Sequence, residues 1–366
     1  MRLFQNSGLY PGYLSRLQML RRGHSSFTGL TDVFLQDRYG ASHFLAPVLA
    51  RDPDAFFTNG DDEAAQRRWA AEHGLPAATS IADILLAQIE DHRTEVFYNL
   101  DPMRYGSAFV RRLPASVKAA VAWRAAPSPG ADFAAYDRVV CNFPSILRTY
   151  EAAGWKAAYL LPAYDPEMDA YAANEDRPVD VLFVGGYTRH HRQRAAILEA
   201  VAKLRNRFRI VFHLDRSRAT RWAESPLGRC IPPLAHHRRP DDIRAVSRDP
   251  VFGRELYQAL SRARVVLNGA IDMAGEDRGN MRCFEAMGCG ALMVSDRGRY
   301  PEGMDGGRTM LTYADPTDAV RVIADILRRE PDGRAMARDG HIEVRQRFSK
   351  EAQWSAFVDV VGSITG

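Results

Sequence analysis

Short apolar runs alternate with longer amphipathic segments through the first 165 residues of the chain. The runs have the length of buried strands, and the segments between them repeat apolar residues at helical spacing. Strands and helices in this alternation predict a parallel sheet with helices on both faces, the α/β class. The predicted strands are Arg2–Gln5, Ala55–Thr58, Glu95–Leu100, Val117–Trp123, Arg138–Cys141 and Lys156–Leu161, and the predicted helices include 13–22, 28–50, Asp61–Gly74, Ile81–Glu90 and Pro144–Ala153.

A polar stretch bounded by prolines, residues 166–178, precedes a second series of strands and helices. We interpret it as a linker between a domain of residues 1–165 and a domain of residues 179–348, followed by a C-terminal helix within 349–366. Residues 216–247 contain four prolines and are expected to be irregular. The predicted strands are Val179–Val184, Phe208–His213, Arg264–Asn268, Ala291–Val294 and Thr309–Tyr313, and the helices are 191–205, Glu255–Ala263, Met281–Met287, Pro316–Arg329, Gly333–Gln346 and Lys350–Ser363.

The length of 366 residues suits two domains, and the contents of 46% hydrophobic and 26% charged residues are ordinary for a soluble enzyme. No apolar run is long enough to span a membrane, and the N-terminus lacks a secretory apolar region. We therefore expect a cytoplasmic protein. The four cysteines form no C-x-x-C pair, which argues against a zinc site or a disulfide framework.

Positive charge is concentrated in one part of the chain. Between Arg189 and Arg254 there are fifteen arginines and one lysine against six acidic residues. Such a segment suits a diphosphate, an anionic acceptor or nucleic acid, and the alternative is a solvated surface. The whole chain has 45 arginines and four lysines, so the preference for arginine itself can also reflect coding bias.

Two glycine turns follow predicted strands. Gly185 and Gly186 follow Val179–Val184 and precede a helix, where backbone N–H groups and the helix N-terminus can hold a phosphate. Arg189 or Arg192 would neutralise it. The first turn of the chain contains Gly8 but no G-x-G-x-x-G motif, so a dinucleotide-binding fingerprint is absent.

An acidic residue interrupts the apolar helix predicted over Met281–Met287. Glu285 lies between Phe284 and Ala286, and a predicted stop at Gly288 leads into the strand Ala291–Val294. A buried carboxylate needs hydrogen-bond donors, and a ribose diol supplies two. The alternative is an acid on the helix surface.

This stretch reads Asp277, seven residues, then Glu285-Ala-Met-Gly-Cys-Gly-Ala-Leu-Met-Val294. It resembles the nucleotide-sugar site of GT-B glycosyltransferases, especially the CgeB-like and group 1 (family 4-like) enzymes. The run from Asp137 to Asp165 also resembles the end of their N-terminal domain. One departure is Asp277, because the retaining enzymes usually carry Glu at this position.

The resemblance implies two Rossmann-like domains facing a cleft and a C-terminal helix that crosses back to the first domain. It implies sugar transfer from a nucleoside-diphosphate sugar to an unidentified acceptor, without a metal or other cofactor. Glu285 would bind the ribose, Asp277 the sugar, and Gly8 would lie near the donor phosphates. By the same resemblance, the further donor contacts would come from Gly185, Gly186, Arg189, Arg192, Arg278, Gly279, Asn280 and Arg282. For Arg282, pairing with Glu285 or Asp277 is an equal alternative to a phosphate contact.

Asp101 follows a predicted strand, at the edge of the sheet where ligands bind in this fold class. It is our candidate for the base that an inverting reaction requires, and the alternative is a helix N-cap. Two other functions stay open at this point. One is a nucleotide-sugar epimerase or hydrolase of the same fold, and the other is a non-catalytic nucleotide or nucleic-acid binding protein.

Overall fold

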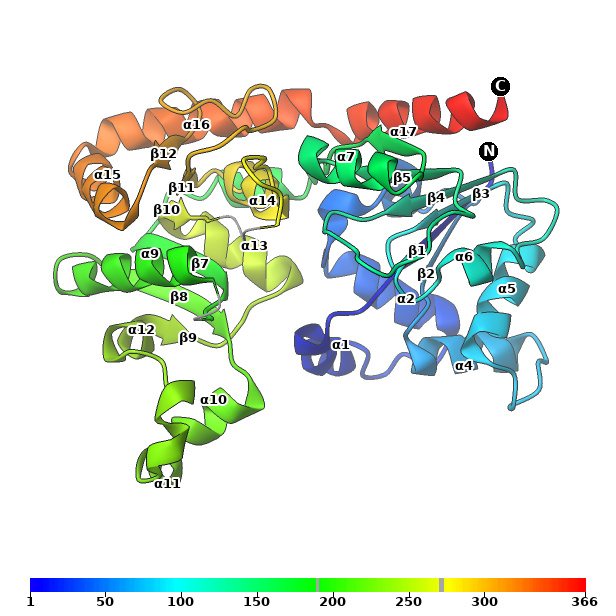
Figure 1. The fold of residues 1–366 in the computed structure, drawn as a ribbon, viewed down its shortest axis with the longest axis horizontal. Helices are drawn as coiled ribbons and strands as arrows, with labels where there is room; N and C mark the ends of the chain where they lie inside the picture. The colour runs from blue at the N-terminus through cyan, green and yellow to red at the C-terminus, as the bar shows by residue number, and fades with distance from the viewer. Residues whose placement is uncertain (189–190, 270–272) are drawn as a thin grey trace. The chain divides into compact units, whose positions relative to one another are not determined.

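The computed structural model describes residues 1–188, 191–269 and 273–366 (Figure 1). The chain divides into two compact units. The first consists of Met1–Asp165, Met273–Asp277 and Phe348–Gly366, and the second of Pro166–Asp272 and Arg278–Arg347. Each unit is built around its own parallel sheet. The two sheets confirm the predicted α/β class with two Rossmann-like domains.

Among the described residues, the sheet of the first unit has six strands in the order β2-β1-β3-β4-β5-β6. All neighbouring strands are parallel, as expected where helices connect successive strands. Buried on both faces, β4 consists of apolar residues throughout. The strands are β1 (Leu3–Ser7), β2 (Ala55–Asn59), β3 (Val96–Asn99), β4 (Ala119–Trp123), β5 (Arg138–Cys141) and β6 (Ala157–Tyr159).

Several helices of the first unit begin at residues whose side chains cap them. Ser26, Asp62 and Ser80 each accept a hydrogen bond from a backbone N–H in the first turn of the helix that follows. The helices are α1 (Leu14–Leu20), α2 (Phe27–Gln36), α3 (Ala46–Ala50), α4 (Glu63–Glu72), α5 (Ile81–Asp91), α6 (Ser107–Val110), α7 (Pro144–Ala152) and α17 (Lys350–Thr365), with 3₁₀ turns η1 (Pro11–Tyr13) and η2 (Ala41–His43).

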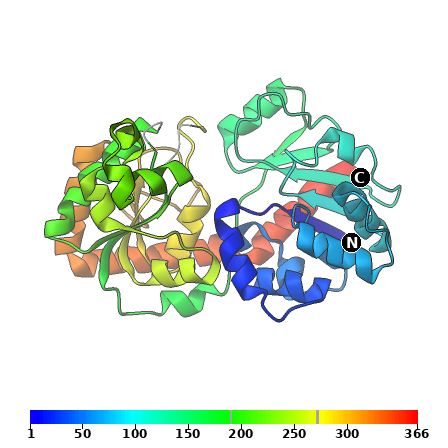
Figure 2. The ribbon, with the colours of Figure 1, turned by 90° about the horizontal axis from the view of Figure 1, so that it is seen from below.

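The C-terminal helix α17 belongs to the first unit, as predicted. It packs on α3 and β4, and Figures 1 and 2 show it in red beside the strands of that unit. Phe357 is fully buried, and its ring centroid lies 4.8 Å from that of Tyr98 in β3. The chain re-enters the first unit at Phe348, one residue before the predicted start of the C-terminal segment at residue 349.

The sheet of the second unit also has six strands within the described part of the chain, in the order β12-β11-β10-β7-β8-β9. The strands are β7 (Val179–Gly186), β8 (Ile210–Asp215), β9 (Ser247–Arg248), β10 (Ala263–Leu267), β11 (Leu292–Asp296) and β12 (Leu311–Tyr313). The helices are α8 (Met168–Ala172), α9 (Arg192–Ala202), α10 (Arg218–Ala223), α11 (Pro226–Arg229), α12 (Asp241–Val246), α13 (Gly253–Ser261), α14 (Met281–Gly288), α15 (Pro316–Arg328) and α16 (Glu330–Arg347), with 3₁₀ turns η3 (Lys203–Asn206) and η4 (Pro232–His237).

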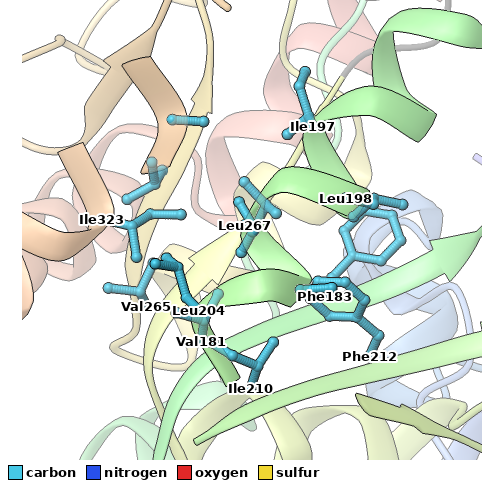
Figure 3. Close-up of a cluster of buried hydrophobic side chains, with 14 of the residues drawn as sticks. Val181, Phe183, Ile197, Leu198, Leu204, Ile210, Phe212, Val265, Leu267 and Ile323 are labelled. Atoms are coloured by element: carbon cyan, nitrogen blue, oxygen red, sulfur yellow. The ribbon is translucent and has the colours of Figure 1, made fainter. Parts of the chain in front are cut away.

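The core of the second unit joins its central strands to the helices beside them. Figure 3 shows the side chains of Val181, Phe212 and Val265 from three strands, with Leu198 of α9 and Ile323 of α15. These five residues are at most 1% exposed. Burial of each such side chain contributes about 1.5–3 kcal/mol, which holds the strand ends in fixed positions.

Three sequence predictions need correction. Residues 216–247 are not irregular, because four short helical segments and the start of β9 lie within them. The predicted linker 166–178 contains α8 and is part of the second unit. The glycine that ends α14 in a left-handed conformation is Gly290 (φ +70°), not Gly288, which is the last helical residue.

No helix among the described residues is both long and apolar enough to cross a membrane.

Candidate active site

The strand order of the second unit places a topological switch point between β7 and β10. From β7 the chain extends the sheet through β8 and β9, and from β10 it extends the sheet in the other direction through β11 and β12. Open parallel sheets bind ligands at the carboxyl ends of the strands beside such a point. The helices that follow these two strands, α9 and α14, therefore begin where a ligand is expected.

The two glycines predicted to form a turn are the last residues of β7. Gly185 and Gly186 pair with Leu214 and Asp215 of β8, so the strand runs two residues beyond the predicted Val184. A Cβ atom on Gly185 would lie 3.1 Å from the ring of Phe183, whereas one on Gly186 would meet nothing within 4 Å. The end of β7 at Gly186 thus leaves space for close approach of a ligand.

Basic side chains lie at the start of α9. The predicted phosphate contact Arg189 lies outside the described residues. Arg192 is the first residue of α9 and is exposed. Arg194, which the sequence analysis did not single out, donates from Nη2 to the carbonyl oxygen of Gly269, just after β10. Arg194 thus ties α9 to the end of the neighbouring strand and adds positive charge to the partial charge of the helix N-terminus.

The residues before α14 form a second group at the same edge. Arg278 donates from Nε to Oδ2 of Asp296, the last residue of β11, at 2.6 Å. Gly279 has φ +106°, which favours glycine. Asn280 is the N-cap of α14, and its Nδ2 lies 3.4 Å from Oδ1 of Asn268. The structure therefore adds Asp296 and Asn268 to the group of Arg278, Gly279 and Asn280. The sequence analysis missed both, although Asn268 ends one predicted strand and Asp296 lies two residues after another.

The side chain of Glu285 is buried within α14, with an exposed fraction of 3%. Arg282 donates from Nη1 to its Oε2 at 2.6 Å. Burial raises the pKa of Glu285, and the charge and hydrogen bond of Arg282 oppose that effect. The other oxygen, Oε1, receives no hydrogen bond from the described residues. Glu285 is therefore a buried carboxylate. Arg282 pairs with it, which was one of the two alternatives that the sequence left open for Arg282.

Asp277 lies in the first unit, whereas Glu285 lies in the second. Oδ2 of Asp277 accepts a hydrogen bond at 2.6 Å from the backbone N–H of Ser145, in the first turn of α7. This carboxylate therefore caps the N-terminus of α7, where negative charge is stabilised by the helix dipole. The sugar contact expected for Asp277 remains a prediction.

The first unit has its own switch point, between β1 and β3. Gly8 follows β1, and Asp101 follows β3. A Cβ atom on Gly8 would lie 3.1 Å from Oδ2 of Asp101, so the absence of a side chain lets the two turns meet. Asp101 is not a helix N-cap; its Oδ2 accepts from Nε of Arg104 at 3.2 Å.

A second carboxylate, missed in the sequence, lies beside this pair. Both oxygens of Asp61, two residues after β2, accept from the backbone N–H of Leu9 at 3.0 Å. Burial raises the pKa of Asp61, the Leu9 hydrogen bond lowers it, and the charge of Asp101 raises it further. Asp61 and Arg104 also line a cavity of about 490 Å³. In the sequence, Asp61 could have been identified from its position directly after Asn59-Gly60 at the end of a predicted strand.

Residues 189–359 match the model of a family described as glycosyl transferase-like. No curated protein matches the chain by sequence. Three solved structures resemble it at 9–11% identity: HepE of Anabaena in complex with UDP and glucose (TM-score 0.60, 11% identity, 99% of this chain and 100% of that one), an alpha-glucosyltransferase with UDP-glucose and abasic DNA (0.60, 10%, 98% and 98%), and a glycosyltransferase from Rickettsia africae (0.54, 9%, 99% and 98%).

The likeness to these structures extends over nearly the whole chain and shows the fold. The family match covers most of the second unit, including β10, α14 and β11. The chain therefore has the GT-B fold of these glycosyltransferases, and its residues 189–359 match a glycosyl transferase-like family.

Proposed function

We propose that the protein transfers a sugar from a nucleoside-diphosphate sugar to an acceptor hydroxyl without the help of a metal ion. The observation that carries this proposal is the environment of the Glu285 side chain, which is buried. Its Oε2 accepts a hydrogen bond from Arg282, and its Oε1 accepts none from the described residues. A ribose hydroxyl would donate to Oε1. This hydrogen bond would compensate part of the cost of burying the carboxylate.

The departing diphosphate requires positive charge, which the second unit supplies without a metal. The N-terminal turns of α9 and α14 present backbone N–H groups at the switch point. Arg192, Arg194 and Arg278 lie on or directly beside these turns. In the proposed reaction the acceptor oxygen bonds to the anomeric carbon, the bond from that carbon to the diphosphate oxygen breaks, and the nucleoside diphosphate leaves with both electrons.

The nucleoside is proposed to be uridine, because the HepE structure contains UDP and the alpha-glucosyltransferase structure contains UDP-glucose. The acceptor would bind in the first unit, near the turn after β1. If the reaction inverts configuration, Asp101 would take the proton of the acceptor hydroxyl, and Asp61 would hold the turn through Leu9. In a retaining reaction the oxygen of the leaving diphosphate would take this proton, and Asp101 would not be needed as a base.

The replacement Glu285→Gln tests the donor site. The neutral amide loses the charge-assisted hydrogen bond, which is worth about 1.5–3 kcal/mol, so UDP affinity should fall about tenfold or more. Titration calorimetry with UDP, GDP, TDP and ADP on both proteins measures the loss and identifies the base. Glu330→Gln, at an exposed surface pair with Arg334, is the control and should bind UDP as the wild type does.

Unchanged UDP affinity in a folded Glu285→Gln protein would remove Glu285 from the site. Product analysis with the preferred donor sugar, in buffer containing EDTA, then separates transfer from hydrolysis or epimerisation. A reaction abolished by EDTA and restored by a divalent cation would contradict the proposed independence from metal.

A further inference from the structure

A groove of about 730 Å³ is lined by residues 216–249, most of them in the segment that the sequence predicted to be irregular. The lining residues begin directly after β8 and end directly after β9, so the groove lies toward the carboxyl ends of these strands. Several of them belong to the short helices α10, α11 and α12, which Figure 1 labels. The charged residues that line it are Arg216, Arg221, Glu224, Arg229, Arg239, Asp241, Arg244, Arg248 and Asp249.

The three acidic residues of this groove are already paired. Glu224 receives bonds from Nε and Nη2 of Arg239, at 2.8 and 2.7 Å. Asp241 receives a bond from Arg244 at 2.7 Å, and Asp249 receives one from Arg216. Each carboxylate therefore neutralises one arginine, and three arginines are left over.

The remaining arginines, Arg221, Arg229 and Arg248, contact no carboxylate among the described residues. Arg229 donates to the carbonyl oxygen of Glu224 at 3.2 Å, and Arg248 donates to that of Ser247 at 2.8 Å. Exposed arginines of α15 and α16 behave differently: Arg321 pairs with Asp318, and Arg334 pairs with Glu330. The excess charge of the Arg189–Arg254 segment is therefore not balanced by local ion pairs in this groove.

The floor of the groove is fixed by a buried ion pair. The side chains of Glu224 and Arg239 are 9% and 7% exposed. Burial alone would raise the pKa of Glu224, but the hydrogen bonds and charge of Arg239 outweigh it and lower the pKa. Arg239 also donates from Nη1 to Oγ of Ser247 at 3.1 Å, which ties the end of α10 to β9. A floor held in this way keeps the arginines around it close together.

We propose that this groove binds a small inorganic anion of the polyphosphate class, such as pyrophosphate or tripolyphosphate. Three uncompensated guanidinium groups match the charge of one such anion, and their planar donors suit phosphate oxygens. Nucleic acid is disfavoured, because its binding depends on many phosphate contacts along the strand, whereas these three arginines lie in one groove. The groove uses neither α9 nor α14, so it is a separate site from the proposed donor site.

The test is titration calorimetry of the full-length protein with sodium pyrophosphate at low salt. The variant Arg221→Gln/Arg229→Gln/Arg248→Gln should bind about 100-fold more weakly than the wild type. The matched control Arg321→Gln/Arg328→Gln/Arg334→Gln removes the same charge from α15 and α16 and should bind within about twofold of the wild type. The single variant Arg221→Gln, at an exposed position, should already show part of the loss.

UDP is titrated into the same proteins. The groove variant should keep the UDP affinity of the wild type, because the groove lies away from Glu285 in the sheet order. Equal losses of UDP and pyrophosphate would assign the groove to the donor site and overturn the proposal. It would also be overturned by no pyrophosphate binding to the wild type, by equal losses in both triple variants, or by retention of a single-stranded oligonucleotide in place of pyrophosphate.

Discussion

Lys350 has an ammonium group that is buried in the first unit. Its Nζ donates to the carbonyl oxygens of Ala41 and Phe44 at 2.7 Å and to Oε1 of Gln353 at 3.1 Å. Burial lowers the pKa of Lys350 to about 7, although the charge of Asp165 acts in the opposite direction. The first residue of α17 is thus attached to the segment between α2 and α3 by a group that titrates near neutral pH.

This shift predicts that stability increases with pH above 7. Between the folded pKa of about 7 and the unfolded value of 10.5, the unfolded chain binds more protons than the folded one, so the free energy of unfolding rises with pH. From pH 7.5 to 9.0 the contribution should be about 2 kcal/mol. Urea unfolding of the wild type and Lys350→Met at both pH values measures it as the difference between the two proteins.

The matched control for this experiment is Lys118→Met, because Lys118 is 64% exposed. It should keep the pH dependence of the wild type. Burial and the charge of Lys350 lower the pKa of His43 to about 3, so His43 stays neutral in the folded protein throughout this range. The same pH dependence in wild type and Lys350→Met would show that the ammonium is not the titrating group.

At the scale of single residues, the sequence predicted some positions and missed others. An acid between Phe284 and Ala286 was expected to be buried, and Glu285 is 2% exposed. Its partner Arg282 is one helical turn away, so local spacing was enough to name it as an alternative. Asp61 was missed, because its donor Leu9 is 52 residues away in the chain and the contact depends on how β1 pairs with β2.

At the scale of elements, the packing of α16 depends on a glycine. A Cβ atom on Gly340 would lie 2.5 Å from the carbonyl oxygen of Thr309 and 3.1 Å from Cε of Met287. Gly340→Ala should therefore destabilise the protein by about 2 kcal/mol, although alanine is the better helix former by about 1 kcal/mol. Thermal and urea unfolding measure the change.

The comparison for this variant is Gly362→Ala in α17, where a Cβ atom would meet nothing within 4 Å. It should stabilise the protein by up to about 1 kcal/mol, since only helix propensity acts there. If both substitutions were stabilising, the close approach of α16 to the segment at Thr309 would be contradicted.

Helices and strands were predicted well where the hydrophobic pattern is strong, and poorly where the elements are short. The strands from Ala55 and Arg138 and the helix from Ile81 begin where the sequence placed them. Residues 216–247 were expected to be irregular because of their prolines. Two of those prolines instead begin short helical segments, at Pro226 and Pro232, where the missing N–H has no intrahelical partner to lose.

At the scale of the whole molecule, the last helix completes the first unit although it is encoded at the other end of the chain. A protein that ends at Arg347 would lose the buried side chains of Lys350, Phe357 and Val361. Hydrogen exchange should then become faster in β3, β4 and α3 and remain unchanged in α9 and α15 of the second unit. Faster exchange in both units, or in neither, would contradict the assignment of α17 to the first unit.

The sequence by itself determined the two parallel sheets, the α/β class and the family resemblance around Glu285, because hydrophobic periodicity and short motifs are local properties of the chain. Tertiary structure decided which polar groups meet. Lys350 and the carbonyl of Ala41 are 309 residues apart, and Asp277 caps α7 from 132 residues away. Such contacts depend on strand order and helix packing, and local spacing carries no information about them.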